Sequence, residues 1–150
     1  MRIAVSSDSV QNLATTICDY LEEKGITLLR FGALDGNEAD YVDAAKAGAE
    51  AVGKGEADYG VLFCNTGTGV SIIANKVHGV RAAFCVDTYA AKIAKLANNA
   101  NCLVLSMRYT GDGLAKEIVD TFLETGPSDE PRRRRFHEKT DELDDFYRRS

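Results

Sequence analysis

Histidine is scarce in this sequence and tryptophan is absent. The two histidines, His78 and His137, are too few to build a histidine-rich metal centre. No stretch approaches the roughly 18 consecutive apolar residues that a membrane-spanning helix needs. Residues 1–5 lead directly into a strand-like run and lack the apolar core and cleavage site of a signal peptide. We therefore expect a cytoplasmic protein without a membrane span.

Cysteine is also sparse, and its spacing matches no paired motif. The four cysteines are Cys18, Cys64, Cys85 and Cys102, and none of them forms a CxxC pair. Three of them lie in apolar stretches, which is typical of reduced thiols rather than of disulfides or a zinc site.

Positive charge is in the minority. The chain has 18 Lys and Arg against 23 Asp and Glu, and a formal net charge of −5, which argues against general nucleic-acid binding. The exception is the run Arg132–Arg135, which acidic residues flank on both sides. Three interpretations of this run are open: it is solvated, it contacts an acidic surface, or, if it reaches a pocket, it binds a phosphate.

Apolar runs alternate with amphipathic segments along the chain. The runs expected to be strands are residues 2–6, 26–31, 61–63, 80–86 and 102–106. The segments expected to be helices are residues 11–24, 41–54, 70–75, 89–96 and 113–124. This alternation predicts an α/β fold with a parallel, doubly wound sheet in one domain.

The composition changes after Gly126, so we divide the chain into a domain of residues 1–126 and a charged tail of residues 127–150. Residues 127–131 form a linker, and residues 138–150 can place Leu143, Phe146 and Tyr147 on one helical face. Because so short a segment rarely folds alone, we expect the tail to pack on the domain or on a partner subunit.

The most informative stretch is Tyr59–Asn75, a buried strand, a glycine-containing turn and a helix. The turn, Cys64–Gly69, reads CNTGTG. Glycines let a backbone approach a ligand closely, and the first amides of a helix are unpaired donors, so such a turn can hold an anion. A thiolate at Cys64 would be favoured there. The alternative interpretations are that the turn is an ordinary strand-to-helix connection and that Cys64 is a small buried hydrophobic side chain.

Other polar residues lie where expected strands begin or end. Asp8 follows the first strand and is interpreted either as a ligand contact or as a helix cap. Asn98 precedes the fifth strand in a group of asparagines, which either shape a loop or contact a substrate. Arg108 follows the fifth strand and can bind an anion or lie at the surface. His78 is expected to be structural.

Several ordered motifs resemble one known family. They are residues 3–8, Asp40-Tyr41, residues 55–58, 64–72, 74–77, 79–83, 87–89, 98–101 and 108–111. Over residues 1–126 the chain resembles the ribose-5-phosphate isomerase B and galactose-6-phosphate isomerase subunit family. The resemblance implies a Rossmann-like α/β/α sandwich with a five-stranded parallel sheet and a C-terminal helical tail. It also implies a homodimer or tetramer with active sites shared between subunits, and aldose–ketose isomerisation of a sugar phosphate through a cis-enediolate, with no cofactor or metal.

The resemblance also assigns roles to residues. Cys64 matches the general base, Thr66 lies beside the reacting oxygens, and Asp8 contacts the substrate. The other residues that it assigns to substrate binding are Ser9, Tyr41, Asn65, Gly67, Gly69, Ser71, Asn98, Arg108, Arg132 and Arg135, with the arginines of the tail offered by the partner subunit.

The chain departs from the family pattern at three positions. Ser9 and Ala97 stand where the family has histidines for phosphate binding and for ring opening, and Asn65 stands where it has glycine. The loss of the ring-opening histidine favours an open-chain substrate such as a tetrose or tetrulose 4-phosphate. A pentose or hexose phosphate remains if Ser9, Tyr89 or His137 fills the gap. A non-catalytic sugar-phosphate-binding protein, or one subunit of a hetero-oligomeric isomerase, is the competing interpretation.

Overall fold

The protein is built on a five-stranded parallel sheet. The computed structural model describes residues 1–148. Its strands are β1 (Arg2–Ser7), β2 (Thr27–Gly32), β3 (Tyr59–Cys64), β4 (Ala82–Phe84) and β5 (Cys102–Ser106), in the spatial order β2-β1-β3-β5-β4. All the pairings are parallel. The expected α/β class and five-stranded sheet are confirmed.

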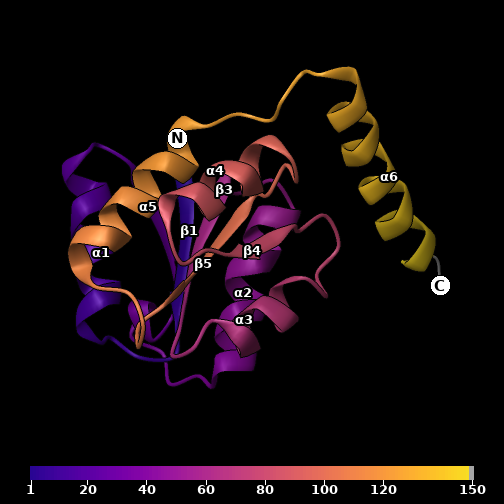
Figure 1. Ribbon diagram of the computed structural model, residues 1–150. Coiled ribbons are helices and arrows are strands. Elements are labelled where there is room, and N and C mark those ends of the chain that lie inside the picture. The colour runs from indigo at the N-terminus through magenta and orange to yellow at the C-terminus, as the bar shows by residue number, and fades with distance from the viewer. Residues whose placement is uncertain (149–150) are drawn as a thin grey trace.

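Helices cover both faces of this sheet (Figure 1). They are α1 (Asn12–Glu23), α2 (Tyr41–Gly53), α3 (Thr68–Ala74), α4 (Thr88–Leu96) and α5 (Asp112–Glu124), and a short 3-10 turn, η1 (Ala33–Asp35), follows β2. Helices α1, α4 and α5 pack on one face, and α2 and α3 pack on the other. The result is the doubly wound sheet that the alternating pattern predicts, in the α/β/α sandwich that the family resemblance implies.

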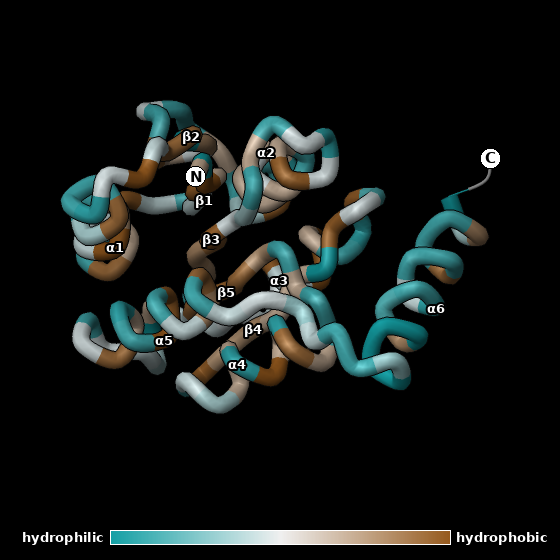
Figure 2. The backbone as a smooth tube through the Cα atoms, turned by 90° about the horizontal axis from the view of Figure 1, so that it is seen from above, coloured by the Kyte–Doolittle hydropathy of each residue, from teal (hydrophilic) through white to brown (hydrophobic). Residues whose placement is uncertain are grey.

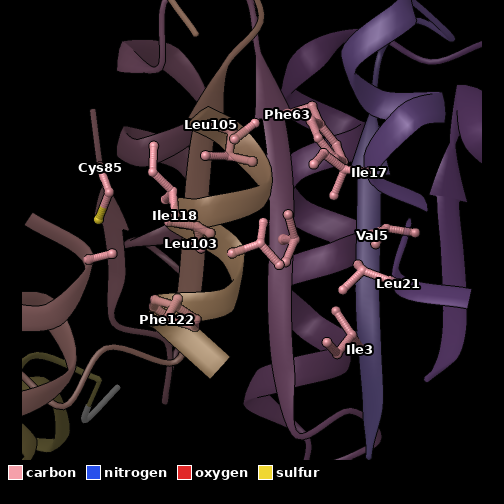
Figure 3. Close-up of a cluster of buried hydrophobic side chains, with 14 of the residues drawn as sticks. Ile3, Val5, Ile17, Leu21, Phe63, Cys85, Leu103, Leu105, Ile118 and Phe122 are labelled. Atoms are coloured by element: carbon pink, nitrogen blue, oxygen red, sulfur yellow. The ribbon is translucent and has the colours of Figure 1, made fainter. Parts of the chain in front are cut away.

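Alternation within the strands divides the core into two layers. On β1, Ile3 and Val5 face α1 and α5, while Ala4 faces α2. Figure 3 shows Ile17 of α1 and Phe122 of α5 packed against the first layer. A slip of one residue would place the large Ile3 and Val5 on the face that the small Ala4 occupies, so the different side-chain sizes of the two layers favour one register.

Two aspartates cap the N-termini of helices. Asp40 accepts a hydrogen bond from the Asp43 amide at 2.8 Å, and Asp87 accepts one from the Ala90 amide at 2.7 Å. Each carboxylate satisfies one of the amides that a helix start leaves unpaired. The cap of α1 is Gln11, so Asp8 does not take the capping role that we considered for it.

The expected strand over residues 80–86 is wrong in its length and burial. Only Ala82–Phe84 is extended, and Phe84 is 36% exposed. Phe84 is exposed because β4 is an edge strand, which pairs only with β5. The strand is short because the Val80 amide donates to the Val77 carbonyl oxygen in a turn before it, and Asp87 caps α4 soon after it. An apolar run indicates burial on average, but it does not tell a central strand from an edge strand.

The tail forms one helix, α6 (Pro131–Tyr147), which begins earlier than residue 138 and includes the arginine run. Pro131 lies in its first turn, where a missing amide hydrogen costs nothing. Figures 1 and 2 show α6 set apart from the rest of the fold and hydrophilic over most of its length. Residues 149 and 150 of the expected tail lie outside the described residues.

Polar contacts hold α6 against its own chain. The His137 ring lies 3.1 Å from the Ala97 carbonyl oxygen, the Gly79 amide donates to Asp144 at 2.8 Å, and the His78 ring lies 2.9 Å from Asp145. His78 is therefore structural, as expected. No helix within residues 1–148 is long and apolar enough to cross a membrane.

Candidate active site

The carboxyl ends of β1, β3 and β5 meet at one edge of the sheet. β1 and β3 are neighbours whose connections leave in opposite directions, so the point between them is the topological switch point of the fold. Asp8 follows β1 directly, and Cys64 is the last residue of β3. This edge is where open α/β sheets place their ligands.

The end of β5 fixes the turn that follows Cys64. The Asn65 carbonyl oxygen accepts hydrogen bonds from the Ser106 hydroxyl at 2.8 Å and from the Arg108 amide at 3.0 Å. The Cys64 carbonyl oxygen accepts one from the Met107 amide at 2.8 Å. Three hydrogen bonds to a neighbouring strand end hold this turn in one conformation and place Arg108 at the same edge.

Two glycines allow the turn to fit between aromatic rings. Gly67 has a left-handed φ of +98°, and a Cβ there would overlap the ring of Phe84. A Cβ at Gly69 would lie 2.8 Å from Cε2 of Tyr41. The Ser71 hydroxyl donates to the Gly67 carbonyl oxygen at 2.6 Å, which ties α3 to the turn. Side chains at residues 67 and 69 are therefore excluded by space, and at Gly67 by φ as well.

A cavity of about 290 Å³ opens beside the turn. The predicted site residues that line it are Asp8, Tyr41, Cys64, Asn65, Thr66 and Gly69. These six residues come from three separate segments of the sequence, and the fold brings them together. Gly67 belongs to the turn itself, and Ser71 of α3 and Arg108 after β5 make hydrogen bonds to that turn.

Cys64 is the cysteine that lines this cavity, and it is 8% exposed. All four cysteines are free, as the sequence predicts. Burial raises the pKa of the Cys85 thiol to about 11 and the pKa of the Cys102 thiol to about 12. Those two thiols are thus held protonated in the core.

The remaining predicted residues lie elsewhere. Asn98 lines a separate groove of about 800 Å³ between α6 and the domain. Arg135 pairs with Glu138 and Glu142 on α6, while the Arg132 guanidinium lies 5.4 Å from the centre of the Phe136 ring. The chain therefore carries two separated groups of predicted site residues, one around Cys64 and one beside α6.

Ser9 occupies neither group. Its hydroxyl oxygen is buried and has no hydrogen-bond partner within residues 1–148, while its amide donates to the Ser7 hydroxyl at 3.1 Å. Its assignment to substrate binding stays a prediction.

Sequence reasoning missed three residues of this site. Thr68 lines the cavity, Ser106 anchors the turn and Phe84 packs against Gly67. The repeated hydroxyl at residues 66 and 68 was a usable signal for Thr68. Ser106 ends an apolar strand, which was a weaker signal that it belongs to the site. No such signal in the sequence pointed to Phe84. Within residues 1–148 no three His, Cys, Asp or Glu side chains group closely enough to hold a metal ion.

Comparisons with known proteins identify relatives of this chain. The family model described as Ribose/Galactose Isomerase matches residues 3–139. The D-erythrulose-4-phosphate isomerase of Pectobacterium atrosepticum is 42% identical over 126 residues, which cover 83% of each chain. The galactose-6-phosphate isomerase subunit LacB of Clostridium acetobutylicum is 43% identical over 125 residues, which cover 83% of this chain and 72% of that one.

A solved structure extends the likeness to the whole fold. The ribose-5-phosphate isomerase B of Clostridium thermocellum superposes with a TM-score of 0.90 at 39% identity, over 98% of this chain and 99% of that one. The resemblance inferred from the motifs is thereby confirmed, and so is the enzyme class, an isomerase. The chain belongs to the ribose/galactose isomerase family.

Proposed function

We propose that this protein is an aldose–ketose isomerase of a sugar phosphate, with Cys64 as its general base. The observation that carries the proposal is the position of the Cys64 thiol, at a strand end and in a cavity, beside a turn that two glycines and the end of β5 hold in place. Family membership supports the reaction class, and the geometry supports the choice of the base.

The proposed reaction moves one proton between neighbouring carbons. The Cys64 thiolate takes the proton from the carbon next to the carbonyl, which gives a thiol and an enediolate. The thiol then returns the proton to the adjacent carbon, while a hydroxyl proton passes from one oxygen to the other. Turn amides around Gly67 and Gly69 are suited to hold the charge that develops on the oxygens, because no Cβ there blocks the approach of the substrate.

Phosphate binding is assigned to arginines from two subunits. Arg108 lies at the edge of the sheet that carries Cys64, whereas Asn98 and Arg132 belong to the group beside α6. A homodimer in which α6 of one subunit approaches the cavity of the other would join the two groups in one site. Exposed apolar side chains on α6, namely Phe136, Leu143, Phe146 and Tyr147, support an interface there.

We further propose an open-chain tetrulose or tetrose 4-phosphate as the substrate. The titratable side chains that line the cavity are those of Asp8, Tyr41 and Cys64, with no histidine among them. A sugar whose fourth oxygen carries the phosphate cannot close into a furanose and needs no ring-opening group. The relative named D-erythrulose-4-phosphate isomerase, at 42% identity, supports the same choice.

A pentose 5-phosphate is the second candidate, because His137 lies next to Ala97, where the family has its ring-opening histidine. The His137 ring contacts the Ala97 carbonyl oxygen at 3.1 Å and is 9% exposed. Tyr89, another of the three candidates to fill the gap, is 72% exposed on α4. A cytoplasmic location is part of the proposal, and four free cysteines are in keeping with a reducing compartment.

The test is a substrate comparison with the purified wild-type protein and its Cys64→Ser variant. We expect a higher kcat/KM for erythrulose 4-phosphate than for ribose 5-phosphate, and a loss of at least about 100-fold in kcat for the variant. Equal or better turnover of ribose 5-phosphate would reject the tetrulose assignment. Full activity of the variant would reject Cys64 as the base, and no turnover of four-, five- or six-carbon sugar phosphates would favour a binding protein or a mixed-subunit enzyme.

A further inference from the structure

We infer that Thr68 is a positioning residue that sets the direction of the Thr66 hydroxyl in the isomerase site, an inference that rests on the proposed function. The Oγ1 atoms of Thr66 and Thr68 are 2.9 Å apart, and either atom can be the donor. Both side chains line the cavity that holds Cys64. The two hydroxyls therefore form a coupled pair at the proposed reaction centre.

The turn itself builds this pair. Thr66 precedes Gly67, whose left-handed φ of +98° reverses the chain, and Thr68 is the first residue of α3. The Thr68 amide also points to the Thr66 hydroxyl oxygen, at 3.5 Å. The hydroxyls are thus brought together by the same glycine that the ring of Phe84 packs against, so their separation depends on the backbone rather than on long, mobile side chains.

The reaction needs a hydroxyl that can both give and accept a proton. At the start, one substrate oxygen is a carbonyl and needs a donor, while its neighbour is a hydroxyl and needs an acceptor. When Thr68 donates to Thr66, the Thr66 proton is left free to point to the substrate carbonyl. When Thr66 donates to Thr68, a lone pair of Thr66 is presented to the cavity. Reversal of one hydrogen bond therefore switches Thr66 between the two tasks.

The proton count closes without another reagent. The proton that Thr66 gives to the carbonyl oxygen is replaced by the proton that leaves the neighbouring substrate hydroxyl. Thr68 keeps its own proton throughout and changes only its direction. The role of Thr68 is thus to orient Thr66 and not to exchange protons with the substrate.

Three substitutions of one residue test this role. Thr68→Val keeps the branched shape and removes the hydroxyl, Thr68→Ser keeps the hydroxyl, and Thr68→Ala leaves room for a water molecule. For Thr68→Val we expect kcat to fall about tenfold while KM stays within about twofold, as for the loss of one hydrogen bond to a group that carries developing charge. Thr68→Ser should restore kcat to within about twofold of wild type, and Thr68→Ala should fall between them because water can replace the hydroxyl.

The readouts separate this role from a structural one. Melting temperatures of the valine and serine variants should agree, and the solvent deuterium isotope effect on kcat should rise in Thr68→Val. Wild-type kcat in Thr68→Val, or equal impairment in Thr68→Ser, would overturn the inference while Cys64→Ser still tests the proposed function. A wild-type protein that turns over no sugar phosphate would overturn both.

Discussion

The ring of Phe84 occupies the space into which a side chain at residue 67 would project. Gly67 also has a left-handed φ of +98°, so this position is closed to other residues for two independent reasons. The contact joins the edge strand β4 to the turn that carries Cys64. The glycine at residue 67 thereby fixes the shape of the proposed site.

We expect Gly67→Ala to abolish most isomerase activity, because the clash with Phe84 must displace the turn and the Cys64 thiol with it. The control is Gly36→Ala, where φ is +75° and no atom lies within 4 Å of the added Cβ. Gly36→Ala should lose only about 1 kcal/mol of unfolding free energy through backbone strain and keep its kcat. Equal kcat for the two variants would mean that the packing of Phe84 on Gly67 does not shape the site.

Lys95 gives a prediction for stability against pH. Its side chain is 1% exposed, its ammonium lies 3.8 Å from the centre of the Tyr59 ring, and its nitrogen has no hydrogen-bond partner within residues 1–148. Burial lowers the pKa of Lys95 from 10.5 to about 8. The unfolded chain thus binds more protons between these values, so the stability contributed by this group should rise with pH from about 8 to about 10.5.

The measurement is the unfolding free energy of Lys95→Met minus that of wild type, at several pH values. Removing a buried charge should make the variant more stable at pH 7, by at most about 3 kcal/mol, since the aromatic rings offset part of the cost of burying the ammonium. The difference should shrink above pH 8. A difference that stays constant up to pH 10.5 would show that Lys95 does not titrate in this range.

The two tail arginines should differ in their importance for phosphate. Arg135 is already paired with Glu138 at 3.1 Å and with Glu142 at 2.9 Å, whereas Arg132 makes no ion pair with another side chain of residues 1–148. We expect Arg132→Gln to raise KM at least about tenfold, and Arg135→Gln to raise it less, because a guanidinium that carboxylates already neutralise attracts phosphate weakly. The reverse order of KM values would assign the phosphate to Arg135.

A shared active site predicts rescue between two impaired variants when they are assayed at a substrate concentration well below KM. A mixed dimer contains one Cys64→Ser subunit and one Arg132→Gln subunit. One of its two sites then combines the intact Cys64 of the second subunit with the intact Arg132 of the first, and the other site carries both substitutions. Random mixing should therefore restore about a quarter of the wild-type activity. A site formed within one subunit gives no rescue, so a mixture no more active than the average of the two parents would reject the shared site.

Much of the fold follows from the sequence because local signals agree with the global arrangement. The buried run before Cys64 and the glycines after it mark a strand end and a tight turn, and Asp40 and Asp87 mark helix starts through their capping bonds. These are short-range interactions, and residues near in sequence decide them.

The features that sequence reasoning got wrong or missed depend on long-range placement. The exposure of Phe84 results from β4 having one neighbouring strand, and an apolar run over residues 80–86 does not carry that information. The contact of Phe84 with Gly67 joins two elements whose approach the fold alone decides. For the same reason, the distance between the Cys64 cavity and the group around Asn98 could not be predicted.

Exchange of substrate hydrogen with solvent tests the central role of Cys64 most directly. The protein is incubated with erythrulose 4-phosphate in heavy water, and the loss of the proton signal on the carbon next to the carbonyl is followed by NMR. We expect exchange with wild type and with Cys18→Ala, a matched loss of a buried thiol in α1, and none above background with Cys64→Ser. Exchange at the wild-type rate in Cys64→Ser would contradict the assignment of Cys64 as the base.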